Sequence, residues 1–162
     1  MKLIFSGDNP YTHGVLKSVV LEKDISDFEE MPASQEVQLV YGSLRVTDIR
    51  TALEFLNDRY PFPPLLPVEP IAAARVRLTM NYILGNLDNP QSLVTLLSEM
   101  TRFVRPNSYI LGDKFTLLDV LLVPLVLKHR TSQPEVMHYL NYVLSTKDSV
   151  RRTWGGELAD AM

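Results

Sequence analysis

Hydrophobic and polar positions follow different periods in the first sixty residues and in the rest of the chain. In the first part, short apolar runs bounded by turn residues predict four strands: 2–5, 28–31, 37–41 and 44–46. Apolar residues spaced three and four apart predict helices at 11–23 and 47–60, with Thr47 or Asp48 as the N-cap of the second. The predicted order for residues 1–60 is therefore β-α-β-β-β-α.

Beyond residue 70 the apolar positions have a helical period only. Five segments show it: 72–87, 91–103, 116–128, 135–144 and 149–162. In the second of them the spacing places Phe103 on the inward face. The third is almost entirely apolar, so we expect it to be the buried central helix. The last is predicted as either a helix or a tail. These periods divide the chain into an α/β subdomain at 1–60 and an all-helical subdomain at 71–162.

A proline-rich connector, residues 61–70, lies between the two parts. Five prolines fall among the eleven residues from Tyr60 to Pro70. Each proline fixes φ and lacks a backbone donor, so we expect the connector to run extended, close to polyproline II, outside any helix or sheet. Such a segment serves either as a stiff linker or as a preformed surface on which a partner protein docks.

The composition is that of a globular protein and excludes several classes of function. The chain has 162 residues, a net charge of −3 and no cysteine. The absence of cysteine excludes disulfides, thiolate metal sites and a catalytic thiol. The arginines are not concentrated in a basic run, which argues against direct nucleic-acid binding. The longest apolar run, 117–127, falls short of the ~20 residues that span a bilayer. We expect a cytoplasmic protein that binds neither membranes nor nucleic acid.

Thr116 and Asp119 have the spacing of a capping box in front of the most apolar helix. The Thr116 hydroxyl can accept a hydrogen bond from the Asp119 N–H, while the Asp119 carboxylate accepts one from the Thr116 N–H. We therefore interpret both residues as a structural N-cap rather than as catalytic groups.

Several of these features together resemble the glutathione-transferase fold. They are the short α/β half, the proline-rich connector and the segment 111–120, Leu-Gly-Asp-Lys-Phe-Thr-Leu-Leu-Asp-Val. The resemblance implies a degenerate thioredoxin-like N-terminal subdomain and a helical C-terminal subdomain. Segment 56–68, Leu-Asn-Asp-Arg-Tyr-Pro-Phe-Pro-Pro-Leu-Leu-Pro-Val, resembles the bacterial stringent starvation protein A family, as do residues 5–7 and 11–15. Phe62 stands where that family usually has histidine, and the chain is short for the family, so it is identified as a shortened and divergent member.

The resemblance implies a non-catalytic transcription regulator of the stress response. Such a protein would bind RNA polymerase holoenzyme, with its sigma factor, through protein–protein contacts centred on the connector. The docking residues would be Tyr60, Pro61, Phe62, Pro63, Pro64 and Glu69. The ring of Phe62 would either anchor the partner or fold inward between the two subdomains. The resemblance also implies a homodimer, or a heterodimer with a related protein, paired through 47–59 and 72–87.

The residues on which glutathione transfer depends are absent or altered. The thiolate-activating hydroxyl or thiol of the transferases falls near Asn9, and the position of their cis-proline is Gln38, which we expect to be trans. The serine that would hold the γ-glutamyl carboxylate is Ile49. The interval between Phe28 and Val37 is also too short for the usual second helix. We therefore expect no glutathione-dependent catalysis and no cofactor.

No metal site is expected either, because the three histidines lie on three separate elements without ligand spacing. Two other functions remain open at this point. The chain could be a divergent transferase-like enzyme that uses another thiol, or a transferase-fold scaffold that only joins subunits.

Overall fold

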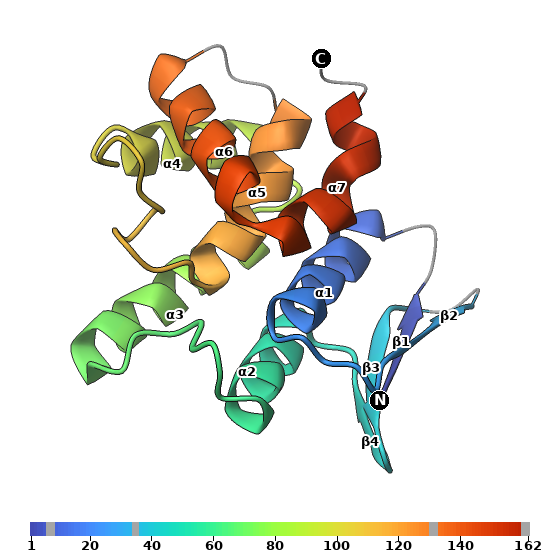
Figure 1. Ribbon diagram of the computed structural model, residues 1–162. Coiled ribbons are helices and arrows are strands. Elements are labelled where there is room, and N and C mark those ends of the chain that lie inside the picture. Colours follow the sequence, from blue (N-terminus) through green and yellow to red (C-terminus); the bar gives the residue numbers. More distant parts are fainter. Residues whose placement is uncertain (6–8, 34–35, 130–132, 160–162) are drawn as a thin grey trace. The chain divides into compact units, whose positions relative to one another are not determined.

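The computed structural model describes residues 1–162 except 6–8, 34–35, 130–132 and 160–162 (Figure 1). The chain forms two compact units, Met1–Pro63 and Pro64–Met162, so the boundary falls inside the proline-rich connector. Each unit has its own hydrophobic core.

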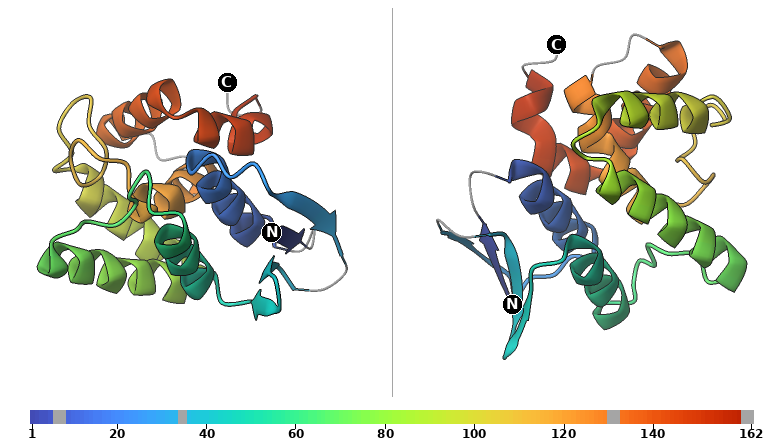
Figure 2. Two further views of the ribbon diagram at one scale, coloured as in Figure 1. Left: turned by 60° about the horizontal axis from the view of Figure 1, so that its bottom comes forward. Right: turned by 180° about the vertical axis from the view of Figure 1, so that it is seen from behind.

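The first unit is a four-stranded sheet with two helices. Its elements are β1 (Lys2–Phe5), α1 (Pro10–Glu22), β2 (Glu29–Pro32), β3 (Gln38–Tyr41), β4 (Leu44–Val46) and α2 (Ile49–Arg59). The strand order is β2-β1-β3-β4. β1 and β2 are parallel because α1 carries the chain back between them, and the other two pairs are antiparallel. Both helices lie on the same side of the sheet (Figures 1 and 2).

The strand register explains which face of the sheet is buried. Glu30, Leu3, Leu39 and Val46 are neighbours across the four strands and therefore point to one face. The three apolar residues of this row are buried, and Lys17 of α1 reaches the Glu30 carboxylate at 2.9 Å, so this face is the helix side. Among the described residues of this unit, no helix covers the opposite face (Figure 2).

The second unit is all-helical. It consists of α3 (Pro70–Gly85), α4 (Pro90–Thr101), α5 (Leu117–His129), α6 (Pro134–Thr146) and α7 (Asp148–Ala159). Every side chain of α5 from Leu117 to Leu127 is buried, and all four other helices contact this helix. The predicted central helix is thus confirmed. No helix among the described residues has the length and apolar character needed to cross a membrane.

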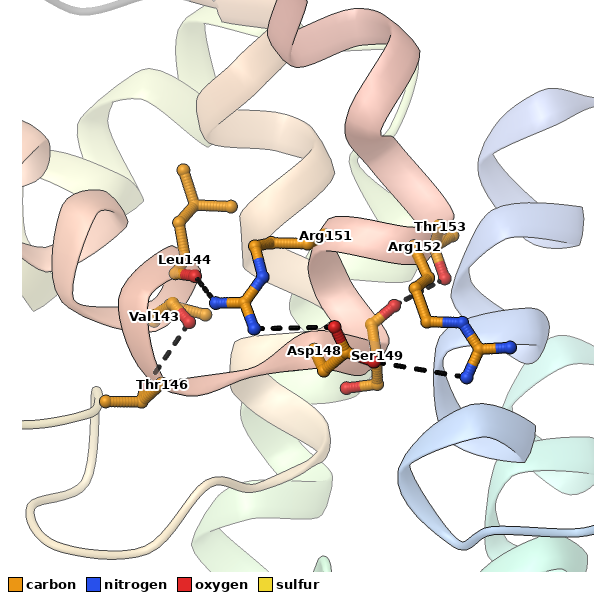
Figure 3. A network of polar contacts seen from close by, with 8 residues as sticks. All are labelled: Val143, Leu144, Thr146, Asp148, Ser149, Arg151, Arg152 and Thr153. Carbon is orange, nitrogen blue, oxygen red and sulfur yellow. Dashed lines mark hydrogen bonds and ion pairs between the residues drawn. The ribbon is translucent and has the colours of Figure 1, made fainter.

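The junction of α6 and α7 is held by a polar network (Figure 3). The Arg151 guanidinium donates to the Leu144 carbonyl at the end of α6 and lies 3.4 Å from the Asp148 carboxylate. Arg152 lies 4.0 Å from the same carboxylate, and the Thr153 hydroxyl donates to the Ser149 carbonyl at 2.8 Å. Arg151 therefore links the end of α6 to α7, whereas Arg152 pairs within α7.

One expectation about local structure was wrong. Phe103 was expected on the inward face of a helix at 91–103, but α4 ends at Thr101 and the Phe103 side chain is 81% exposed. Beyond Thr101 the chain turns, with the Val104 N–H donating to the Thr101 carbonyl, so the helical period no longer places Phe103 inward. The connector lies outside any strand, and no helix begins before Pro70, as expected; its Phe62–Pro63 bond is cis.

Candidate functional site

The first half of the connector, residues 61–63, and Tyr60 directly before it are held by the buried Lys23 at the C-cap of α1. The Lys23 ammonium donates to the carbonyls of Tyr60 at 2.6 Å and of Pro63 at 2.8 Å. Its side chain is almost completely buried. Both acceptors lie in a stretch where prolines remove backbone donors, so these carbonyls need a donor from elsewhere in the chain. The two hydrogen bonds fix the backbone on both sides of Phe62.

The ring of Phe62 is exposed on this fixed backbone. Its side chain is 80% exposed, and its neighbours Pro61 and Pro63 are exposed as well. A large aromatic ring on a restrained loop loses little conformational entropy when a partner covers it.

The residues just before Phe62 form a small polar–aromatic cluster. The Arg59 guanidinium lies 5.4 Å from the centre of the Tyr41 ring and 5.2 Å from that of Tyr60. Arg59 Nε also donates to the Tyr41 hydroxyl at 3.0 Å, and this hydrogen bond raises the pKa of the guanidinium. The Tyr41 ring packs edge-on against Phe55 of α2. Arg59 thus links the end of α2 to β3 and to Tyr60, the residue before the connector.

Burial lowers the pKa of Lys23 to about 8. The carboxylates of Glu22 and Asp58 oppose this shift because they favour the charged amine. At neutral pH the amine is therefore protonated and can donate to both connector carbonyls.

The second half of the connector, residues 64–70, is anchored to the helical unit. The Leu65 side chain is 1% exposed, and its carbonyl accepts a hydrogen bond at 2.9 Å from the N–H of Leu117, the first residue of α5. The Glu69 carboxylate accepts from the N–H groups of Ile71 at 2.9 Å and Ala72 at 2.7 Å, so it caps α3. These hydrogen bonds lower the pKa of Glu69. The cap was not anticipated for a residue that the sequence placed on the docking surface.

The predicted cap residues of α5 belong to a buried hydrogen-bond network. One Asp119 oxygen accepts from the Thr116 N–H at 2.8 Å and from the Thr116 hydroxyl at 3.2 Å. The other accepts from the Ile110 N–H and from the Tyr139 hydroxyl, both at 2.9 Å. Burial raises the pKa of Asp119, and the four donors oppose this shift because they favour the carboxylate. This carboxylate joins three segments of the second unit.

A separate cavity in the first unit occupies the position where the transferase residues were sought. It has a volume of about 370 Å³ and is lined by Asn9, Thr12, Glu36, Val37, Thr47, Asp48 and Ile49. Asn9 Oδ1 accepts from the Thr12 N–H at 3.1 Å, and Asp48 Oδ2 accepts from the Thr51 N–H at 2.7 Å. Both side chains are therefore helix caps. The cavity offers two carboxylates, Glu36 and Asp48, which is unfavourable for an anionic tripeptide.

The other positions at which transferases carry functional groups can be compared where the structure describes them. The only cis peptide bond among the described residues is Phe62–Pro63, so the bond before Gln38 is trans. Ile49 lies in the cavity wall without a polar side chain. Ser6, another hydroxyl near this position, lies outside the described residues. Within the described part of the chain, no three histidine or acidic side chains come close enough to bind a metal ion.

Comparison with known proteins identifies the family. No protein-family model matches the chain. The stringent starvation protein A homologue of Haemophilus ducreyi is 30% identical over 157 aligned residues, which cover 78% of this chain and 73% of that protein. The chain belongs to the stringent starvation protein A family. The homologue of Coxiella burnetii is 31% identical over 104 residues, and the match covers about half of each protein. That of Haemophilus influenzae is 27% identical, with 96% of this chain and 90% of that protein covered.

Solved structures show the fold of this family member. A glutathione transferase homologue from Burkholderia with bound glutathione has a TM-score of 0.79 and 17% identity, and 98% of this chain and 97% of that one are covered. A glutathione S-transferase from Legionella pneumophila has a TM-score of 0.78 and 15% identity, with 98% and 100% covered. The predicted fold, a thioredoxin-like subdomain followed by a helical one, is confirmed.

The sequence analysis did not identify Lys23 and Leu65, the two residues that position the connector of this stringent starvation protein A family member. Lys23 lies 37 and 40 residues before its two acceptors, so no local pattern indicates the contact. The sequence does contain one indication of this contact. The proline stretch has few backbone donors, so its carbonyls need a donor from elsewhere in the chain. Leu65 was not distinguished from Leu66, although only Leu65 is fully buried. Of the predicted docking residues, the structure exposes Pro61, Phe62, Pro63, Pro64 and Glu69, while Tyr60 is half-buried.

Proposed function

We propose that this chain is a non-catalytic, cytoplasmic transcription regulator of the stress response that binds RNA polymerase holoenzyme through the connector. The observation that carries the proposal is the exposed ring of Phe62 on a backbone held by Lys23. Membership of the stringent starvation protein A family supports the same function. In this proposal Phe62 is the anchor, and Pro61 and Pro63 are rigid apolar neighbours. Tyr60, Pro64 and Glu69 flank the contact.

The partner surface would contain the polymerase and its sigma factor, and DNA would be reached only through them. A restrained aromatic side chain contributes more binding energy than its area alone indicates, because little motion is lost on association. The exposed Arg59 next to Tyr60 would favour acidic partner groups near the anchor.

The test is capture of purified RNA polymerase holoenzyme by the immobilised native chain, compared with two matched variants. Phe62→Ala removes the proposed anchor. Phe103→Ala removes a phenylalanine that is equally exposed but lies outside the connector. We expect Phe62→Ala to weaken binding by about 2–4 kcal/mol, roughly 30- to 1000-fold, as for an interface hot spot. Phe103→Ala should bind like the native chain. Equal affinities for both variants would contradict the proposal.

The chain would act as a dimer, with itself or with a related protein. Ile71, Leu78 and Tyr82 lie along one side of α3 and are exposed, which leaves an apolar strip on this helix. A two-fold pairing of α3 would cover the strip. Light scattering that finds only an 18.4 kDa particle, alone and after mixing with a related protein, would contradict this part of the proposal.

The competing function is glutathione-dependent catalysis, and the 370 Å³ cavity is where it would occur. We expect no saturable heat when millimolar glutathione is titrated into the native chain, because Asn9 and Asp48 are engaged as caps and Ile49 offers no hydroxyl. A dissociation constant below about 1 mM, equivalent to roughly −4 kcal/mol, would revive the enzyme interpretation.

A further inference from the structure

The 370 Å³ cavity of the first unit has an acidic lining to which docking at Phe62 assigns no role. Its residues come from the start of α1, the segment before β3 and the segment around the start of α2. Among the described residues, the charged ones that line it are Glu36 and Asp48. The volume lies within the range of about 300–1,000 Å³ that is usual for small-molecule sites in proteins.

Both carboxylates have oxygens that can accept hydrogen bonds from an occupant. The Thr51 hydroxyl and N–H donate to Asp48 Oδ2 and lower the pKa of this carboxyl, so it is ionised at neutral pH. No described residue donates to Oδ1 of the same group. Glu36 is exposed, and its side chain makes no ion pair or hydrogen bond within the described part of the chain.

Neighbouring charges do not cancel the negative charge of the lining. Arg50 attracts the Asp48 carboxylate, but its guanidinium also pairs with Glu54 at 3.1 Å. Three carboxylates, those of Glu36, Asp48 and Glu54, thus stand against one cation. The N-termini of α1 and α2 add a partial positive charge of about half a unit each, which still leaves this region negative. A cationic occupant is therefore favoured over a neutral or anionic one.

A buried hydroxyl in the same lining favours an occupant that donates hydrogen bonds. Thr12 of α1 lines the cavity and is 8% exposed. Its N–H donates to Asn9 Oδ1, but its hydroxyl makes no hydrogen bond to a described residue. A buried polar group without a partner is costly, and a donor from an occupant would remove that cost.

An organic ammonium group suits this set of acceptors. It has three N–H donors and no acceptor, and the lining offers two carboxylates and a hydroxyl. A metal ion is less well served, because no three histidine or acidic side chains of the described residues come close enough to bind one.

We propose that this cavity binds a small alkylammonium ion, and a short-chain diammonium more tightly than a monoammonium. The ammonium groups donate to Asp48 Oδ1, to Glu36 and to the Thr12 hydroxyl, and the alkyl chain lies against Val37 and Ile49. The proposal concerns the first unit alone and holds whether or not the polymerase binds at the connector.

The native chain allows a direct test by NMR with ¹³C-labelled isoleucine δ1 methyl groups. Butane-1,4-diammonium (putrescine) is titrated at constant ionic strength, because salt screens exposed charges. The comparison probes are butylammonium, the neutral butane-1,4-diol, the dianion succinate, and Mg²⁺ as an inorganic divalent cation. We expect a saturable shift of the Ile49 signal, assigned with Ile49→Val. The signals of Ile71 and Ile83, which do not line the cavity, should stay unchanged.

The order of affinities follows from the charge of each probe. Putrescine should bind at least about threefold more tightly than butylammonium, because it can face both carboxylates. It should also bind more tightly than Mg²⁺, which lacks N–H donors. The diol and succinate should give no saturable shift.

Variants that remove one charge or one hydroxyl locate the site. Asp48→Asn keeps a side chain that caps helices well, and Glu36→Gln keeps the length of the side chain. Each should weaken putrescine binding about threefold or more. Glu99→Gln, at an exposed position of α4 outside the lining, loses the same charge and should bind like the native chain. Thr12→Val should weaken binding about twofold or more. Melting curves establish that each variant is folded.

Three results would overturn the proposal. The first is an Ile49 signal that does not saturate with putrescine. The second is binding of succinate or Mg²⁺ as tight as that of putrescine. The third is undiminished putrescine binding by the folded variants at both position 36 and position 48.

Discussion

Both halves of the connector contain prolines, yet the structure uses the two halves in different ways. In residues 60–63 the backbone is held by Lys23, and the Phe62 side chain is exposed. In residues 64–70 the side chains themselves are engaged, since Leu65 is buried and Glu69 caps α3. The difference indicates that proline content alone does not determine whether a segment exposes its side chains or packs them into the fold.

The largest expected effect in this comparison is on stability. Leu65→Ala should lower the free energy of unfolding by about 2–5 kcal/mol, because a buried leucine is replaced and a cavity is left. Leu66→Ala, half-buried in the same segment, is the matched control and should cost less. Denaturant unfolding followed by circular dichroism measures both. A loss at Leu65 no larger than at Leu66 would mean that the second half does not anchor the fold.

Removal of the lysine that holds the first half should have an intermediate effect. Lys23→Met deletes two hydrogen bonds from a charged donor, each worth about 1.5–3 kcal/mol, but it also removes a buried charge. We expect a net loss of about 1–2 kcal/mol in unfolding free energy at pH 7. Polymerase affinity should fall about tenfold, because the loop around Phe62 must then be ordered on binding.

Lys2→Met serves as the control for this variant, because Lys2 is exposed and its ion pair with Glu29 spans 3.7 Å at the surface. It should change neither quantity appreciably. Full polymerase affinity in Lys23→Met would show that the lysine does not position the anchor.

The pH dependence of stability also tests whether Lys23 is buried as a charged amine. The pKa of Lys23 is about 8 in the folded chain and near 10.5 when unfolded, so between these values the unfolded state binds more protons. Stability from this group therefore rises with pH over that window, by at most about 1.4 kcal/mol per pH unit. As pH increases from 8 to 10, the unfolding free energy of the native chain should therefore rise relative to that of Lys23→Met. A constant difference across this range would contradict the burial of the charged amine.

Much of the fold was predictable from periodicity. The strand β4 and the start of β1 lie where the apolar runs placed them, and α5 was identified because its apolar residues occur on every side. The N-cap of α2 was narrowed to two residues, and the structure selects Asp48. The last segment forms α7 up to Ala159. These features depend on neighbours within a few residues, which a single sequence contains.

The candidate site was only partly predictable. The connector and the prominence of Phe62 followed from the unusual run of prolines, but the sequence left open whether the ring points inward. The hydrogen bonds from Lys23 to the carbonyls on either side of Phe62 join residues about forty positions apart, so no local pattern indicates them. The role of Glu69 depends on where α3 begins, and here the helix starts at Pro70 rather than at residue 72. The exposure of Phe103 likewise depends on where α4 ends.

The most direct test of the account combines two measurements on one variant, Phe62→Ala with Pro61→Ala. Its unfolding free energy and its affinity for RNA polymerase holoenzyme are measured on the same preparation. If the first half of the connector presents an anchor without supporting the fold, affinity falls about 30- to 1000-fold. Stability then changes by no more than about 0.5 kcal/mol for each exposed substitution. A stability loss of about 3–5 kcal/mol, the cost of truncating a buried aromatic, with binding retained would contradict the account and make residues 60–63 a structural linker.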